Sequence, residues 1–245
     1  DIIAYLGKLF SLDINNAILL SRFLFSFFVF LLIYGFILLF TKEKLAALVT
    51  SSFLMLGNSL FARQAIFQIL QGEYLNTSYL NYTRPVNPLM THFFFFSFLL
   101  CFWLFLEKKQ WRWGVLSALI LGLSFYDYFY TWTFLYAFLG ILIVIFLLRK
   151  KWREAKRIGL VLLGALLIAL PYLFNIYRAT LHPNYAEVSQ RFVFETRSYT
   201  LGLVVPLLLV IFLLCFPRKY KEQYYFGLAL VIAPFIVLNQ QFITG

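Results

Sequence analysis

The chain has 245 residues, of which 62% are hydrophobic and 13% charged, against about a quarter charged in an ordinary soluble domain. This composition excludes a soluble globular enzyme. The formal net charge of +11 does not indicate nucleic-acid binding, because the cations lie in short segments between long apolar runs.

Apolar runs of about 20 residues recur along the chain, each long enough to cross a hydrocarbon layer of roughly 30 Å as a helix. Only helices and closed barrels satisfy the backbone in lipid, and these runs lack the alternation of barrel strands. The sequence therefore predicts an all-α fold. We expect a polytopic transmembrane helical bundle, one transmembrane domain over residues 1–245.

The first segment, residues 1–16, is too short and too polar to cross a membrane. Its apolar residues Ile2, Leu6, Leu9 and Phe10 fall on one helical face. This pattern predicts an N-terminal interfacial helix, lying in the plane of the membrane surface. A poorly ordered terminus is the alternative.

About eight apolar runs follow, each taken as a membrane span. Two longer polar segments, about 63–87 and 178–198, interrupt them and are expected to be outer loops. The predicted spans cover residues 17–41, 45–65, 88–106, 113–126, 132–148, 158–177, 200–216 and 224–239.

Lysine and arginine orient these spans. Of the 21 cations, 14 lie in very short connections that alternate along the chain, and the other 7 belong to the opposite side, where they are spread over much longer segments. Short loops rich in lysine and arginine stay in the cytoplasm. Both chain ends and the polar outer loops are therefore expected on the non-cytoplasmic face, and a functional site is expected there too.

The first candidate group lies at the outer end of the third span, in Thr83-Arg84-Pro85-Val86-Asn87-Pro88. The prolines stiffen this segment, and the guanidinium of Arg84 offers a planar set of donors suited to phosphate. Arg63 and Glu73 belong to the same loop and are further substrate-binding candidates. In the alternative interpretation, the prolines only begin a helix and Arg84 reaches to lipid headgroups.

The second candidate group is the stretch Phe125-Tyr126-Asp127-Tyr128-Phe129-Tyr130-Thr131-Trp132. It connects two spans through a turn too tight for a separate loop. A carboxylate at this depth is costly unless it faces protein or water. Asp127 is therefore a candidate for catalysis or sugar binding, with Tyr128 and Trp132 as stacking surfaces. The alternative is an interfacial aromatic belt with Asp127 in a salt bridge.

Two weaker groups complete the outer face. The loop after the sixth span carries Arg178 and Arg197, which suit a lipid phosphate, although a solvated surface of mixed charge explains them equally well. Gln240 lies among three amides after the last span and either binds a sugar hydroxyl or caps the helix. We find no metal-ligand spacing and expect no cofactor, with dependence on a divalent metal left open.

Three of these segments resemble a known family. YTRPVNP, FYDYFYTWT and NQQFITG together are similar to polytopic glycosyltransferases of the GT-C type, relatives of the protein mannosyltransferases and the lipid-A sugar transferases. The resemblance implies transfer of a sugar from a polyprenyl-phosphate carrier to an acceptor, at the outer face of a bacterial or archaeal cell membrane. It also implies that an acidic residue in the first outer loop acts as the base on the acceptor, and that arginines in later outer loops bind the carrier phosphate.

The chain departs from that pattern at its start. In the family, an acidic pair precedes the interfacial helix, whereas here only Asp1 stands at that place. We therefore expect a piece of a longer protein that lacks the first span, with Asp1 or Asp127 as the catalytic carboxylate. A solute transporter or lipid flippase is the main alternative, and a non-catalytic membrane scaffold is a third.

Overall fold

A computed structural model describes residues 7–8, 11, 13–60, 70–71, 89–183, 185, 204–215 and 221–238. Within these residues the fold is helical and contains no strand. Its main helices are α2 (Ile14–Thr41), α3 (Lys44–Leu60), α5 (Leu89–Lys108), α6 (Trp111–Ser124), α7 (Phe129–Leu148), α8 (Trp152–Thr180), α10 (Val204–Cys215) and α11 (Lys221–Leu238).

Each predicted span corresponds to one of these helices, so the all-α prediction is confirmed. Four helical segments are long and apolar enough to cross a membrane: Asn15–Thr41, Leu89–Lys108, Phe129–Leu148 and Trp152–Thr180. They indicate an integral membrane protein. The expected number of about eight spans is not confirmed, because the other helices are shorter. Helix α6 has 14 residues and rises about 21 Å, less than a hydrocarbon layer of about 30 Å.

The chain forms two compact units, residues 1–113 and 114–245. The single transmembrane domain expected from the sequence stays a prediction.

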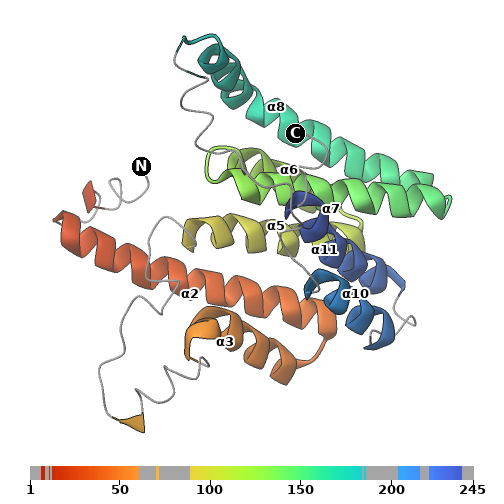
Figure 1. Cartoon of the computed structure of the whole chain (residues 1–245), viewed down its shortest axis with the longest axis horizontal. Helices are drawn as coiled ribbons and strands as arrows, with labels where there is room; N and C mark the ends of the chain where they lie inside the picture. Colours follow the sequence, from red (N-terminus) through yellow and green to blue (C-terminus); the bar gives the residue numbers. More distant parts are fainter. Residues whose placement is uncertain are drawn as a thin grey trace. The chain divides into compact units, whose positions relative to one another are not determined.

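In the first unit, α2 packs against both α3 and α5 (Figure 1). Val29 and Ile33 of α2 and Leu89 of α5 are fully buried at the centre of this contact. Phe25 and Phe93 meet edge to face, with ring centroids 5.8 Å apart. Apolar packing therefore joins the three helices.

Helix α2 begins at Ile14, slightly before the predicted start at residue 17. Asp13 is the cause, because its carboxylate accepts the backbone N–H of Asn16 at 3.1 Å and caps the helix. Residues 14–16 thus belong to α2 and not to the expected interfacial segment. Most of that segment, residues 1–6 among them, lies outside the described residues.

In the second unit, α7 lies between α8 and α11, and α10 packs on α11 (Figure 1). Leu135, Phe138, Leu139 and Leu142 of α7 are fully buried. The rings of Phe138 and Phe226 meet edge to face at 4.9 Å and join α7 to α11.

Helix α8 buries mainly alanine and exposes most of its large apolar side chains. Its buried residues are Ala155, Ile158, Val161, Ala165 and Ala169. Its exposed large side chains include Leu160, Leu163, Leu166, Leu167, Leu170 and Phe174. Helices in lipid pack through small residues, because leucine gains nothing by leaving hydrocarbon. This arrangement supports the membrane assignment independently of helix length.

The lysine-rich connections within each unit share one end. In the first unit, Lys42 after α2 pairs with Glu107 at the end of α5, with Nζ and Oε1 2.9 Å apart. In the second, Lys151 after α7 pairs with Glu222 at the start of α11 at 3.8 Å. These exposed pairs add little stability. They do place the end of α2 beside the end of α5, and the end of α7 beside the start of α11.

Lysines also close the turns at these ends. Lys42, Lys109 and Lys150 adopt left-handed backbone conformations, with φ of 63°, 57° and 58°. Glycine is the usual residue there, since it has no Cβ to clash. A lysine keeps a cation beside the negative end of the helix dipole and at the expected cytoplasmic face.

A close approach of α6 to α8 in the second unit predicts a packing defect. A Cβ added at Gly122 of α6 would lie 2.6 Å from Cβ of Ile168 on α8, whereas one added at Gly140 of α7 would meet nothing within 4 Å. We expect Gly122→Ala to lower the free energy of unfolding by about 1–3 kcal/mol through overpacking. Thermal unfolding in detergent measures this.

Gly140→Ala is the matched control and should leave the unfolding temperature unchanged or slightly raised, because alanine favours helix. Equal unfolding temperatures for the two variants would contradict the close packing of α6 on α8.

Candidate functional site at the turn between α6 and α7

Helices α6 and α7 are joined by a four-residue turn, residues 125–128. Ser124 ends α6, and its hydroxyl donates to the carbonyl of Leu121 at 2.7 Å. The backbone N–H groups of residues 125–127 each donate to the carbonyl three residues earlier, at 3.0 to 3.4 Å. Tyr128 is extended, with φ −132° and ψ 130°, and α7 begins after it. These bonds satisfy the turn internally, so its backbone can lie close to the hydrocarbon layer.

Asp127 lies at the end of this turn, immediately before the N-terminus of α7, and is half-buried. The N-terminus of a helix carries unsatisfied N–H groups and a partial positive charge, which stabilises a nearby carboxylate. Tyr128, the residue that caps α7, contributes no side-chain hydrogen bond to the helix. The turn therefore keeps an acidic group at the N-terminal end of α7.

Four aromatic rings surround the turn, and we call them the inner aromatic cluster: Phe125, Trp132, Tyr136 and Tyr172. Phe125 is 3% exposed and stacks on Trp132, with centroids 4.4 Å apart and planes 10° apart. Tyr136 and Tyr172 meet the Phe125 ring from the side, at 5.5 and 5.8 Å. The cluster draws on the turn, on α7 and on α8.

The inner aromatic cluster has unused hydrogen-bonding groups. Nε1 of Trp132 and the hydroxyl of Tyr136 are buried and make no hydrogen bond in the part of the chain that the structure describes; the same holds for the hydroxyl of Thr131. Buried polar groups almost always have partners, and leaving one unsatisfied costs about 1–3 kcal/mol. Such groups gather where a ligand or water completes them.

A second set of aromatic side chains faces outward. Tyr126, Tyr128, Phe129 and Tyr130 are 37% to 50% exposed. The Tyr126 hydroxyl donates to the carbonyl of Ile168 at 3.4 Å, which ties the turn to α8 just before Pro171. Exposed tyrosines at a helix end are typical of the membrane–water boundary.

The structure brings together three of the residues expected at the site. Asp127, Tyr128 and Trp132 lie on the turn and the first turn of α7. Arg178 is exposed near the C-terminus of α8, its guanidinium carbon 6.0 Å from the Phe174 ring centroid. It shares the end of α8 that carries Tyr172, but no contact joins it to Asp127. The other expected site residues, Asp1, Arg63, Glu73, Arg84, Arg197 and Gln240, lie outside the described residues.

Two residues of the site were not expected, Tyr136 and Tyr172, whereas Thr131 belongs to the expected stretch but had no role assigned to it. Tyr136 follows Trp132 by one helical turn, so helical spacing from Trp132 is a signal that identifies it. Tyr172 follows Pro171, and nothing in the sequence relates it to Phe125. Only the packing of α8 brings its ring to the cluster.

The described residues contain no group of three His, Cys, Asp or Glu side chains close enough to hold a metal ion. His92 of α5 lies against Phe96 instead, with ring centroids 5.9 Å apart. The polar and aromatic groups that the site offers are the carboxylate, the aromatic rings and the buried donors.

Comparison with known proteins finds no matching family model, no matching curated protein and no matching solved structure.

The buried hydroxyl of Tyr136 predicts an unusual response to mutation. Removing an unsatisfied polar atom without changing the ring should raise the free energy of unfolding in the absence of ligand, by about 1 kcal/mol for Tyr136→Phe. Thermal unfolding in detergent measures the change.

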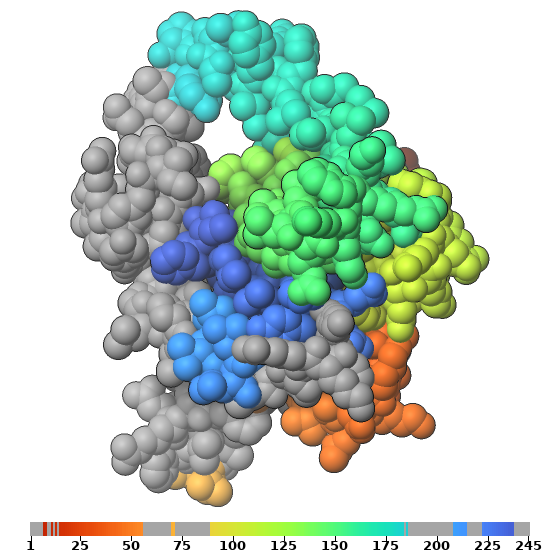
Figure 2. Space-filling view, turned by 90° about the vertical axis from the view of Figure 1, so that its right-hand side faces the viewer, coloured from red at the N-terminus to blue at the C-terminus, as the bar shows by residue number. Residues whose placement is uncertain are grey.

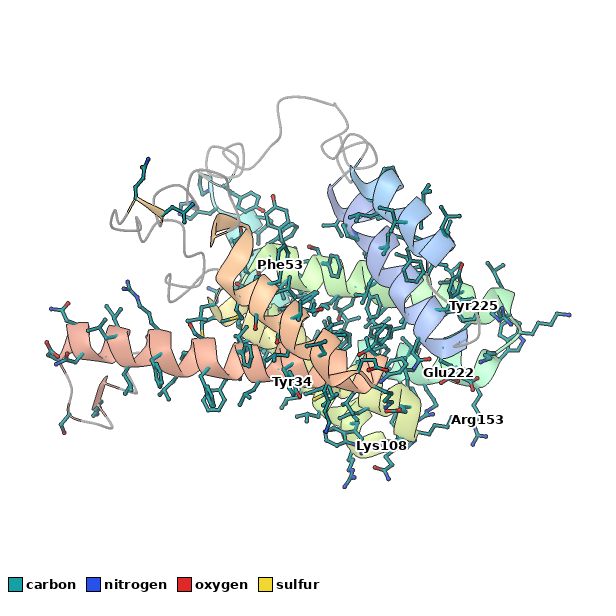
Figure 3. The ribbon with its side chains drawn as sticks, turned by 90° about the horizontal axis from the view of Figure 1, so that it is seen from below. Tyr34, Phe53, Lys108, Arg153, Glu222 and Tyr225 are labelled. Atoms are coloured by element: carbon teal, nitrogen blue, oxygen red, sulfur yellow. The ribbon has the colours of Figure 1, made fainter. Side chains whose placement is uncertain are left out.

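Tyr34→Phe is the control. Tyr34 of α2 (Figure 3) stacks on Phe30 and is only half-buried, so we expect no change in stability. Destabilisation by Tyr136→Phe alone would mean that this hydroxyl is already bonded in the folded protein.

Proposed function

We propose that the protein is an integral membrane glycosyltransferase, which moves a sugar from a polyprenyl-phosphate carrier to an acceptor at the outer membrane face. The observation that carries the proposal is the turn between α6 and α7, where a half-buried carboxylate adjoins stacked aromatic rings with unused donors. Aromatic rings offer apolar faces to sugar rings, and buried donors bond sugar hydroxyls.

Trp132 and Tyr136 would bind the sugar through these donors. The acceptor hydroxyl oxygen attacks the anomeric carbon as the bond from that carbon to the phosphate oxygen breaks. The acceptor loses its proton to a carboxylate, for which Asp127 and Asp1 are the candidates. The carrier leaves as an anion with the bonding electron pair, and arginine neutralises its charge. Arg84 is our first choice, with Arg63, Arg178 and Arg197 as further candidates.

The location of the turn suits this reaction. A polyprenyl tail stays in hydrocarbon while its phosphate and sugar meet water, so the site must lie at the boundary. The exposed tyrosines of residues 126–130 are typical of that depth. The turn also lies at the end of α7 opposite the cationic connection, which agrees with an outer face.

A transport pathway has less support. Transporters and flippases place charged or polar groups near mid-membrane, often in broken helices. Among the described residues, the buried polar side chains are Ser21, Ser51, Ser117, Ser124 and Thr131, and none is charged. Three of the serines donate to carbonyls of their own helices.

We further propose that the shorter helices also cross the membrane, which gives about eight spans and places the turn between α6 and α7 on the non-cytoplasmic face. The shared end of the lysine-rich connections supports this arrangement. A helix as short as α6 can still span the hydrocarbon layer when an aromatic turn such as residues 125–130 follows it, because the aromatic side chains extend into the membrane interface.

Single cysteines on either side of α6 test this topology. In a background lacking Cys101 and Cys215, a membrane-impermeant maleimide applied outside intact cells should label Tyr126→Cys and not Lys109→Cys. Permeabilised cells should label both, which controls for reactivity. Labelling of both positions in intact cells would mean that α6 does not cross.

A transfer assay tests the function. The full-length protein in liposomes, given radiolabelled polyprenyl-phosphate sugars, should transfer label to an acceptor. Asp127→Asn should lower the rate about 10² to 10⁴-fold if it removes the base. Arg84→Ala should lower the transfer rate about 10² to 10³-fold, because the negative charge that develops on the departing phosphate is then no longer neutralised by the guanidinium.

Asp13→Asn is the matched control, because asparagine caps a helix as well as aspartate does and the charge change is the same. It should transfer at the native rate. Label that crosses the bilayer without transfer, for every donor tried, would favour a flippase and contradict the proposal.

A further inference from the structure

The connection between α7 and α8 and the start of α8 form a strongly cationic segment, residues 149–157, which we call the basic turn. It holds six cations and a single carboxylate, Glu154. In Figure 2 its green surface faces the viewer beside the blue surface of α11. The cations are Arg149, Lys150, Lys151, Arg153, Lys156 and Arg157.

Helix α11 holds part of the basic turn in place. The Arg149 guanidinium donates to the Tyr225 hydroxyl and lies over that ring, 4.6 Å from its centroid. Lys151 pairs with Glu222 at 3.8 Å. Glu222 and Tyr225 are marked on α11 in Figure 3. These contacts fix the turn on a rigid element but use only two of its cations.

Three other cations of the basic turn are exposed: Lys150, Arg153 and Lys156. None of them forms an ion pair within the described part of the chain. Figure 3 shows Arg153 directed away from the helices. By contrast, Lys42 in the corresponding turn after α2 is neutralised by Glu107.

The polarity of α8 adds to this positive potential. A helix N-terminus is stabilised by acidic residues and destabilised by cations. Helix α8 has Glu154 as the one acid in its first turn. Lys151 occupies the N-cap position, and its side chain makes no hydrogen bond to the backbone N–H groups of the helix. An anion near the first turn of α8 would meet both the exposed cations and the unsatisfied N–H groups of the helix.

Apolar side chains flank the same segment. Leu148 is 80% exposed and Trp152 is 60% exposed. A tryptophan at a helix end is typical of the headgroup region, where its apolar body meets lipid and its N–H meets water. The anion that fits the basic turn therefore carries an apolar tail.

We propose that the basic turn binds the headgroup of an anionic phospholipid, with Lys150, Arg153 and Lys156 on its phosphate and Leu148 and Trp152 against its acyl chains. This site lies at the other end of α7 from Asp127, about 30 Å away for a 20-residue helix. It does not depend on the proposed glycosyltransferase activity.

Native mass spectrometry of the full chain in neutral detergent tests this site. The lipid probes are phosphatidylglycerol and phosphatidylcholine of the same acyl length, with inorganic phosphate as a competitor. We expect phosphatidylglycerol to bind more tightly than phosphatidylcholine. The triple variant Lys150→Gln, Arg153→Gln, Lys156→Gln should weaken that binding by about a hundredfold, since it removes three cations from the phosphate.

The matched control is Lys44→Gln, Lys108→Gln, Lys109→Gln, which removes the same charge from exposed positions of the first unit. It should retain binding within about threefold of the native chain. Equal losses in the two triple variants would show attraction by net charge alone and overturn the site. Equal affinity for the two lipids, or full displacement by millimolar phosphate, would also overturn it.

Circular dichroism checks that both variants remain helical. If the basic-turn variant loses helicity, the single variant Arg153→Lys is tested in its place, because it keeps the positive charge at this position. It should bind phosphatidylglycerol within about threefold of the native chain, and a loss as large as that of the triple variant would contradict the site.

Discussion

Peptide groups inside a hydrocarbon layer find no water to bond, so each must bond within its own helix. Every other feature of the chain depends on this constraint. Charged side chains leave the spans and gather at helix ends, where the backbone also exposes its unsatisfied groups. Chemistry in such a protein is consequently confined to the two ends of its helices.

The two ends of α7 carry surfaces of very different chemistry. One end carries a carboxylate, stacked aromatic rings and buried donors without partners. The other carries six cations, of which Arg149 and Lys151 contact Tyr225 and Glu222 of α11. The first surface suits a neutral, hydroxylated ligand, and the second suits an anion. A polar substrate and a structural lipid can thus be recognised by the same helix without competing.

Packing inside the second unit determines what the aromatic end contains. Gly122 lets α6 approach α8 so closely that a methyl group would collide with Ile168. This approach brings the Tyr126 hydroxyl to the Ile168 carbonyl and the ring of Tyr172 to Phe125. A small residue in the last helical turn of α6 therefore positions the rings around the carboxylate.

The apolar runs were sufficient to predict the helices, because burial of the backbone in lipid is a property of each segment alone. The distribution of lysine and arginine predicted which connections share an end, and the pairs Lys42–Glu107 and Lys151–Glu222 agree within each unit. Helix limits were less predictable. Helix α8 extends to Trp152 and Thr180, past the apolar run of 158–177, because its polar ends remain helical beyond the hydrocarbon.

The site itself was only partly predictable. Asp127, Tyr128 and Trp132 are adjacent in sequence, so their proximity follows from one turn. The contribution of Tyr172 depends on tertiary packing, and the unused donors of Trp132 and Tyr136 depend on what surrounds them in the fold. Neither the contact of Tyr172 nor the lack of partners for these donors can be predicted from the spacing of residues along the chain. The arginines proposed for the carrier phosphate, apart from Arg178, lie outside the described residues and remain sequence-based predictions.

Photo-crosslinking tests the central claim most directly. A polyprenyl-phosphate sugar with a photoreactive group on the sugar would be irradiated with the full-length protein in liposomes, and the labelled peptides would be identified by mass spectrometry. We expect label within residues 125–136, lost when unmodified donor is added in excess. Label on the basic turn or spread along α2, unaffected by unmodified donor, would contradict a sugar site at the turn between α6 and α7.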